Sequence, residues 1–190
     1  MMSKPVIALI AEDDTDCETI QVIVRRVLGD RTPTRKWASK GCSTLKGKLS
    51  AKLSALSAQG CNAFVVIHDL DRNPRNNTLN DESKLRKTLE SLSSKLSNTH
   101  ICIPIEELEA WFWSDPNVVE DVGRGQGKAS VNPHEIQKPK EKLMALSKGA
   151  NRKPRYSTND NPRLAQLLNL DLCQQRCPAF KRLVIFLQNL

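Results

Sequence analysis

The chain of 190 residues is 39% hydrophobic and carries a formal net charge of +8 at pH 7. No stretch approaches the roughly 18 consecutive apolar residues of a membrane span, and the six cysteines are scattered without the spacing of a zinc site or a disulfide framework. We therefore expect a single-domain cytoplasmic protein that folds without cross-links and does not enter a membrane.

Short apolar runs alternate with helical patterns in the first part of the chain. Residues 5–11 have the length of a buried strand, and a stripe of apolar residues at helical spacing follows. A basic segment around Trp37 is a candidate second strand, and leucine-striped helices then separate two further strands at 62–69 and 99–105. For residues 1–114 this order predicts an α/β core, an open, mostly parallel sheet with helices on both faces.

Residues 115–190 are expected to form a helical extension packed on that core. The Gly-rich and polar composition of 115–135 predicts a mobile loop. Pro139 would begin a short helix that ends near Leu146, and Pro162 and Pro178 each stand where the first turn of a helix would begin. The chain is therefore predicted to be one domain with a C-terminal helical addition.

Acidic residues follow three of the predicted strands. Glu12 ends the first run, Asp69 and Asp71 end the run that begins at 62, and Glu106 and Glu109 follow the last. In open parallel sheets, ligands bind beyond the carboxyl ends of the strands. These five carboxylates are therefore expected to converge at one edge of the sheet.

The pair Asp69 and Asp71 is the most informative of these groups. Side chains two positions apart on an extended backbone leave the same face, so both carboxylates can share one cation. Oxygen ligands without Cys or His favour Mg²⁺ or Mn²⁺ over zinc. Glu12 is expected to complete the metal site or to act as a general acid or base, and either Glu106 or Glu109, on one face of a starting helix, would reach the cation. A structural role for the Asp pair in capping a loop is the alternative.

Positive charge gathers in two segments. No acidic residue occurs between Arg31 and His68, and Glu141 alone interrupts the basic run from Lys138 to Arg155. Basic surfaces beside clustered acids suggest a polyanion held next to a cation site, although a merely solvated surface is the alternative. The candidate nucleic-acid contacts are Arg35, Lys36, Lys40, Lys46, Lys48, Lys138, Lys140, Arg152, Lys153 and Arg155.

The segment IALIAEDD, followed by an amphipathic helix, resembles the start of a response-regulator receiver domain. The resemblance implies that Asp13 and Asp14 bind magnesium beside a phosphoacceptor, Asp69. A receiver also needs Thr or Ser after the fourth strand, where this chain has Glu106 and Glu109. From the residues alone, Asp13 and Asp14 are more simply explained as first-turn residues that complement a helix dipole.

A second resemblance covers nearly the whole chain. Glu12, the Asp69-x-Asp71 pair and the acidic residues after the fourth strand are similar to a Toprim domain, the metal-dependent module of topoisomerases, primases and OLD-family nucleases. The segments EELEAWFWSD, KPKEKL and NLDLCQQRCPAF are further similar to a family of small, stand-alone bacterial Toprim-like proteins. Members of that family often lie beside genes for ABC- or SMC-type ATPases and are suspected of phage defence. The chain lacks the Gly that usually follows the first Glu, since Asp13 and Asp14 stand there.

The Toprim resemblance implies metal-dependent hydrolysis of phosphodiester bonds in DNA or RNA. Asp69 and Asp71 would hold one or two Mg²⁺ or Mn²⁺ ions, Glu12 would be the general base or a further ligand, and Glu109, with Glu106, would complete the site. An ABC- or SMC-type ATPase partner and a homo-oligomer are compatible with it. The alternative is a catalytically idle Toprim-like or receiver-like module that binds a partner and signals through metal or phosphate.

Overall fold

The computed structural model describes residues 5–148 and 153–190. Four strands form one sheet in the order β2-β1-β3-β4, and all neighbouring strands are parallel. The strands are β1 (Ile7–Ala11), β2 (Thr34–Ala38), β3 (Ala63–Ile67) and β4 (Thr99–Cys102). The predicted α/β class with an open parallel sheet is confirmed, and the segment around Trp37 supplies the edge strand β2.

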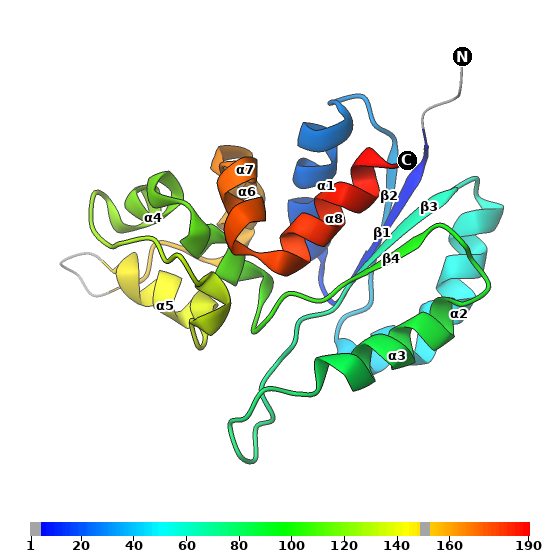
Figure 1. The fold of residues 1–190 in the computed structure, drawn as a ribbon, viewed down its shortest axis with the longest axis horizontal. Coiled ribbons are helices and arrows are strands. Elements are labelled where there is room, and N and C mark those ends of the chain that lie inside the picture. Colours follow the sequence, from blue (N-terminus) through cyan, green and yellow to red (C-terminus); the bar gives the residue numbers. More distant parts are fainter. Residues whose placement is uncertain (1–4, 149–152) are drawn as a thin grey trace.

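Helices connect the strands and continue after the last one (Figure 1). Those of the sheet region are α1 (Asp14–Leu28), α2 (Cys42–Ala58) and α3 (Glu82–Ser93). The α-helices beyond β4 are α4 (Pro116–Gly123), α5 (Pro139–Leu146), α6 (Asn161–Leu167), α7 (Leu170–Arg176) and α8 (Pro178–Gln188). Three 3₁₀ segments complete the order: η1 (Leu108–Ser114), η2 (Pro133–Glu135) and η3 (Thr158–Asp160). Pro139 and Pro178 begin their helices and Pro162 lies in the first turn of α6, where a missing N–H costs nothing.

Both faces of the sheet are covered (Figure 1). Alternate residues of β1 and β3 point to opposite faces, so Leu9 and Val65 join a core cluster with α1, whereas Ile10 and Val66 join a second cluster with α2 and α3. Every residue of β1 and β3 is buried. This two-sided burial explains why their sequences are continuous apolar runs rather than alternating ones.

The segment after β4 contributes to the core on the α1 side. Val118, Leu164 and Phe180 belong to the same buried cluster as residues of β1 and α1. Helices α6 and α8 pack against α1, and α8 also contacts β4. The rings of Trp111 and Phe180 pack edge to face at a centroid distance of 5.0 Å, which joins the two parts of the chain.

Two local predictions are wrong. The stretch 115–135 is not one loop, because it contains α4 and η2. The side chain of Asp115 caps α4, Pro116 takes the first turn, and three valines of the helix are buried in the core; the glycines that follow at 123–127 hid this pattern. Glu106 and Glu109 do not share a helical face, since the helix after β4 is a 3₁₀ segment that begins at Leu108.

The cysteines behave as small apolar residues. All six are free; Cys42 is half-buried and the others are buried. Within the described parts of the chain, no helix is long and apolar enough to cross a membrane.

Candidate active site

Carboxylates gather beyond the carboxyl ends of β1, β3 and β4. Strands β1 and β3 are direct neighbours, and Glu12 and Asp69 follow their last paired residues, Ile10 and Val66, by two and three positions. The structure surrounds Asp69 with the negative charges of Asp16, Glu109, Asp71 and Glu12, and burial together with these charges raises the pKa of Asp69 well above its usual value. Four of the five predicted carboxylates therefore meet at one place, and Asp16 joins them.

Glu12 is held by the turn that follows β1. Its backbone carbonyl accepts hydrogen bonds from the N–H groups of Lys40 and Gly41 at 2.8 and 3.2 Å. Its Oε1 is buried and has no hydrogen-bond donor among the described residues. Burial, followed by the charge of Asp71, raises the pKa of Glu12 to about 7, although Lys46 partly offsets the rise. A buried oxygen without a donor is suited to a cation.

His68 lies beside Glu12 and is 4% exposed. Its Nδ1 lies 2.8 Å from the carbonyl oxygen of Asp69 and 3.3 Å from Oε1 of Glu12. Because a carbonyl oxygen only accepts, Nδ1 carries the hydrogen, and Nε2 is the unprotonated nitrogen of a neutral ring. Burial lowers the pKa of His68, which favours this neutral form. The ring thus fixes the backbone at Asp69 while touching Glu12.

Asp69 and Asp71 differ in their surroundings. Oδ1 of Asp69 accepts a hydrogen bond from the backbone N–H of Leu108 at 3.0 Å, which ties the end of β3 to the start of η1. Asp71 is exposed, and its backbone carbonyl accepts from the backbone and the side chain of Asn80 at 3.1 and 2.6 Å. Burial and the charge of Glu107 raise the pKa of Asp71. Asp69 is thus the fixed member of the pair, and Asp71 faces solvent.

Asp16, which the sequence pattern did not single out, belongs to the same cluster. It lies in the first turn of α1 and is 9% exposed. Burial, and then the charges of Asp13, Glu109 and Glu12, raises the pKa of Asp16 to about 8. The signal was present in the sequence, because Asp16 lies one turn before the buried Ile20 and so falls on the apolar stripe of this helix.

Glu109 is buried in η1 and is fixed from the C-terminal part of the chain. It is 4% exposed, and its Oε1 accepts a hydrogen bond from Nδ2 of Asn161 at 3.0 Å. Oδ1 of Asn161 accepts in turn from the hydroxyl of Tyr156 at 2.7 Å. Burial raises the pKa of Glu109, and the bond from Asn161 partly offsets it.

Glu107 and Lys140 form an ion pair beside the cluster. Nζ of Lys140 lies 2.9 Å from Oε1 of Glu107, and the backbone N–H of Lys140 donates to Oε2 at 3.2 Å. Burial by itself would lower the pKa of Lys140, but the pairing with Glu107 raises it overall. Lys140 is close enough to oppose the raised pKa values of Asp16 and Asp71. Glu107 was not predicted, because a partner 33 positions away leaves no local pattern.

Glu106 is placed differently from the other predicted carboxylates. It is 4% exposed, its backbone is left-handed with a φ of 66°, and its oxygens accept from the guanidinium of Arg72, with Nε at 2.8 Å from Oε1. The charge of Glu106 is therefore already neutralised by a cation of the chain itself. It supports the loop after β3 next to Asp71.

A cleft of about 300 Å³ opens onto the cluster. Its walls include His68, Asp69 and Asp71, together with Lys46 from α2 and Lys84 from α3. Carboxylates for a cation and lysines for an anion thus share one cavity.

The other predicted basic residues are dispersed over the surface. Lys36 pairs with Glu18 at 3.0 Å, and Arg155 lines a separate hollow of about 290 Å³. Arg152 lies outside the described residues. The remaining predicted contacts, all exposed, are Arg35, Lys40, Lys48, Lys138 and Lys153.

The donor set fits a hard divalent cation. Glu12, Asp16, Asp69, Asp71 and Glu109 offer carboxylate oxygens, which is the ligand type of Mg²⁺ and Mn²⁺. Within the described chain, no three of its acidic, His or Cys side chains are already arranged to hold one ion. Binding of one ion by three of these carboxylates would therefore require their side chains to move closer together.

The receiver-like roles of Asp13 and Asp14 receive less support from the geometry. The side chain of Asp13 caps α1 by accepting from the N–H of Asp16 at 2.9 Å and from the hydroxyl of Thr15 at 2.7 Å. Asp14 is exposed. Asp16, rather than either of them, is the residue of this helix whose charge acts on Asp69.

Comparison with known proteins identifies a family but no activity. Residues 11–188 match a family model described as a domain of unknown function (DUF4276). No curated protein and no solved structure matches the chain.

Proposed function

The chain belongs to the DUF4276 family, and we propose that it is a metal-dependent nuclease that hydrolyses phosphodiester bonds in DNA or RNA. The observation that carries this proposal is the crowding of carboxylates around Asp69, which raises its pKa well above the ordinary value. Such crowding destabilises the ionised protein, and clustered groups with raised pKa values in a cleft are typical of functional sites. A bound divalent cation would offset this destabilisation, because its positive charge favours the ionised carboxylates.

The residues of the cluster fall into two roles. Asp69 and Asp71 would hold one or two ions, with Glu109 and Asp16 completing the set of ligands. Glu12 would accept the proton of the attacking water or serve as a further ligand, and His68 positions it through the 3.3 Å contact. The bound Mg²⁺ or Mn²⁺ would stabilise the charge that develops on the phosphate and lower the pKa of the water.

Positive side chains around the cleft support a phosphodiester as the substrate. Lys46 lines the cavity, and Lys140 lies among the acids although it pairs with Glu107. These ammonium groups would hold the non-bridging oxygens of a phosphate beside the cation. The proposal agrees with the resemblance of the sequence to Toprim domains. An ATPase partner, a role in phage defence and a homo-oligomer remain predictions from that resemblance.

The test is cleavage of plasmid, single-stranded DNA and tRNA by the purified protein with Mg²⁺ or Mn²⁺. Asp69→Asn and Glu12→Gln should each reduce cleavage about a hundredfold or more, because each removes a charge that acts on the reacting centre. Asp14→Asn is the matched control, since Asp14 is an exposed carboxylate in the same region and should leave the rate unchanged.

Binding of Mn²⁺, measured by calorimetry on the same proteins, separates the metal site from the reaction. We expect binding by the wild type and by Asp14→Asn and its loss in Asp69→Asn. Cleavage that survives in Asp69→Asn, or a wild type that binds Mn²⁺ but cleaves none of the three substrates, would contradict the nuclease proposal.

A further inference from the structure

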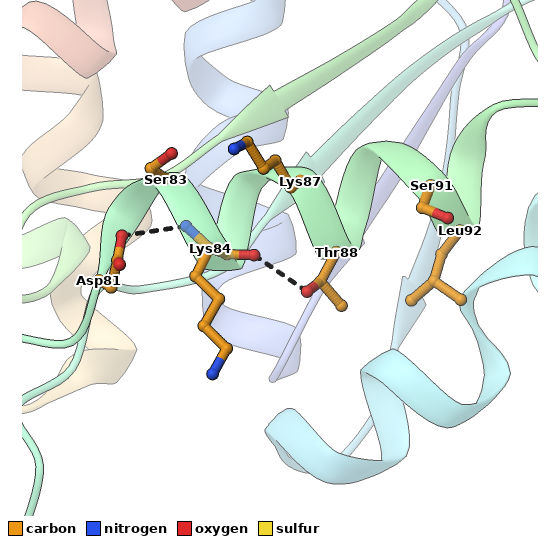
Figure 2. A pocket seen from close by; sticks show the side chains of 7 residues that line it. All are labelled: Asp81, Ser83, Lys84, Lys87, Thr88, Ser91 and Leu92. Carbon is orange, nitrogen blue, oxygen red and sulfur yellow. Dashed lines mark hydrogen bonds between the residues drawn. The ribbon is translucent and has the colours of Figure 1, made fainter.

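The cleft continues into a second hollow along α3. This hollow has a volume of about 540 Å³ and shares Asp81, Lys84 and Thr88 with the walls of the cleft. Its other lining residues are Ser83, Lys87, Ser91 and Leu92 (Figure 2). The two hollows therefore adjoin, and together they form a groove that runs along the exposed side of α3 and ends at Asp69 and Asp71.

The charged residues of α3 differ in whether they are paired. The second hollow is lined by Lys84 and Lys87 together with three hydroxyl side chains, and Figure 2 shows the two lysines extending to opposite sides of the helix. Glu82 pairs with Arg86 at 2.9 Å and lies 3.5 Å from Arg182 of α8. Glu82 is therefore neutralised, whereas Lys84 and Lys87 make no ion pair in the described parts of the chain.

The carboxylate in the groove is already engaged. Asp81 caps α3 by accepting from the backbone N–H of Lys84 at 3.0 Å. In the described parts of the chain, the ammonium groups of Lys84, Lys87 and Lys46 make no ion pair. The groove therefore offers lysines without a partner in the protein, next to hydroxyls that can donate to phosphate oxygens.

We propose that this groove binds the sugar–phosphate backbone of the nucleic-acid substrate and guides it from α3 to the carboxylate cluster. The inference rests on the proposed nuclease function and adds the path of the substrate. Lys84 and Lys87 contact successive phosphates, and Lys46 contacts the phosphate nearest to Asp71. A stretch from Asp81 to Leu92 spans about 16 Å of helix, which is long enough to follow several phosphates of one strand.

The composition of the groove also predicts whether binding depends on the base sequence of the nucleic acid. Lysines and hydroxyls contact phosphates and position a strand without reading bases. Neither hollow is lined by Phe, Tyr or Trp, and the imidazole of His68 in the cleft wall is buried, so no exposed ring is offered for a base to stack on. Binding along α3 is therefore independent of base sequence and depends steeply on salt.

The experiment measures fluorescence anisotropy of a labelled 20-nucleotide oligo(dT), an RNA strand of the same length and a 20-base-pair duplex, in EDTA so that no strand is cut. The double variant Lys84→Gln/Lys87→Gln should weaken binding about tenfold at 0.1 M salt and lower the slope of log affinity against log salt by about 2. Lys95→Gln is the matched control, because Lys95 is exposed just beyond the same helix and lines neither hollow. It should bind as the wild type does.

The outcomes distinguish nucleic-acid binding in the groove from the proposed nuclease activity. An unchanged salt slope in the double variant, or a wild type that binds none of the probes, would overturn the proposal that the groove binds nucleic acid. Calorimetry with Mn²⁺ should give the same affinity for the double variant and the wild type, because neither lysine is a metal ligand. Loss of Mn²⁺ binding in Asp69→Asn with intact oligonucleotide binding in EDTA would support the groove independently of catalysis. All variants are compared by thermal unfolding, which exposed lysines should leave unchanged.

Discussion

The side chain of Asn161 donates a hydrogen bond to Glu109 at 3.0 Å and so joins the start of α6 to the carboxylate cluster. The other side of the same amide accepts from the hydroxyl of Tyr156 at 2.7 Å, and all three side chains are buried. The C-terminal part of the chain therefore helps to form the candidate active site as well as the core.

Replacing Asn161 with Ala should lower the free energy of unfolding by about 2–4 kcal/mol, since both Glu109 and Tyr156 would lose a buried partner. Tyr156→Phe is the control. It removes one hydroxyl but keeps the bond to Glu109, so its cost should be about 1 kcal/mol. Urea denaturation measures both, and equal costs for the two variants would argue against the role of Asn161 as a link.

Asp16→Asn should stabilise the metal-free protein and weaken Mn²⁺ binding. It removes one of several buried like charges, so we expect a gain of about 1–3 kcal/mol in EDTA together with a loss of metal affinity. Asp14→Asn, an exposed change in the same helix, should alter neither quantity. A variant at Asp16 that binds Mn²⁺ as tightly as the wild type would exclude this residue from the cation site.

The stability of the metal-free protein should decrease from about pH 5 to about pH 8.5. The pKa values of Glu12 and Asp16 are raised to about 7 and about 8 from 4.5 and 3.8. Their contribution to stability is fully present below the ordinary values, where both carboxyls are protonated, and it is lost as the pH rises through about 7 and about 8. Unfolding in EDTA at several pH values measures this, and Mg²⁺ should restore more stability at the alkaline end of the range than at the acidic end.

The double variant Glu12→Gln/Asp16→Asn is the control for this pH dependence. It removes both titrations, so its stability should vary less across the same pH range than that of the wild type. The same slope in both proteins would show that other groups cause the loss.

Arg72→Ala should lower the free energy of unfolding by about 2–4 kcal/mol, because it leaves the carboxylate of Glu106 buried without its partner. Arg75→Ala is the matched control, because Arg75 is an exposed arginine of the same loop without an ion pair in the described chain. It should leave the free energy of unfolding unchanged. Chemical denaturation of both variants distinguishes a local structural role of the pair from a general effect of lost charge.

Several parts of the fold could be predicted because the signals are local. The apolar runs that became β1 and β3 have the length of strands, and Asp81 and the prolines at 139 and 178 mark helix starts. The helix α4 was missed since a Gly-rich stretch follows it directly, although Asp115 and Pro116 form a capping signal of the same kind. Short helices between turn residues are the weakest case for periodicity.

The candidate site was predicted in part for a different reason. Glu12, Asp69 and Asp71 follow strands, so a parallel sheet alone places them at one edge. Asp16 lies on the apolar stripe of α1, but placing it in the cluster required knowing which face of α1 meets that edge. The pairing of Glu106 with Arg72 depended on a left-handed turn before η1, which removed Glu106 from the helical register.

The sequence by itself determined most of the strands and helices and which carboxylates stand at strand ends, because these depend on the order of neighbouring residues. The tertiary structure alone decided which side chains meet across the chain, as in Glu107 with Lys140 and Glu109 with Asn161, 33 and 52 positions apart. It also decided that Lys84 of α3 lines the same cavity as Asp69. Such contacts depend on how α3, α5 and α6 pack around the sheet, and packing is set by the whole core rather than by any local pattern.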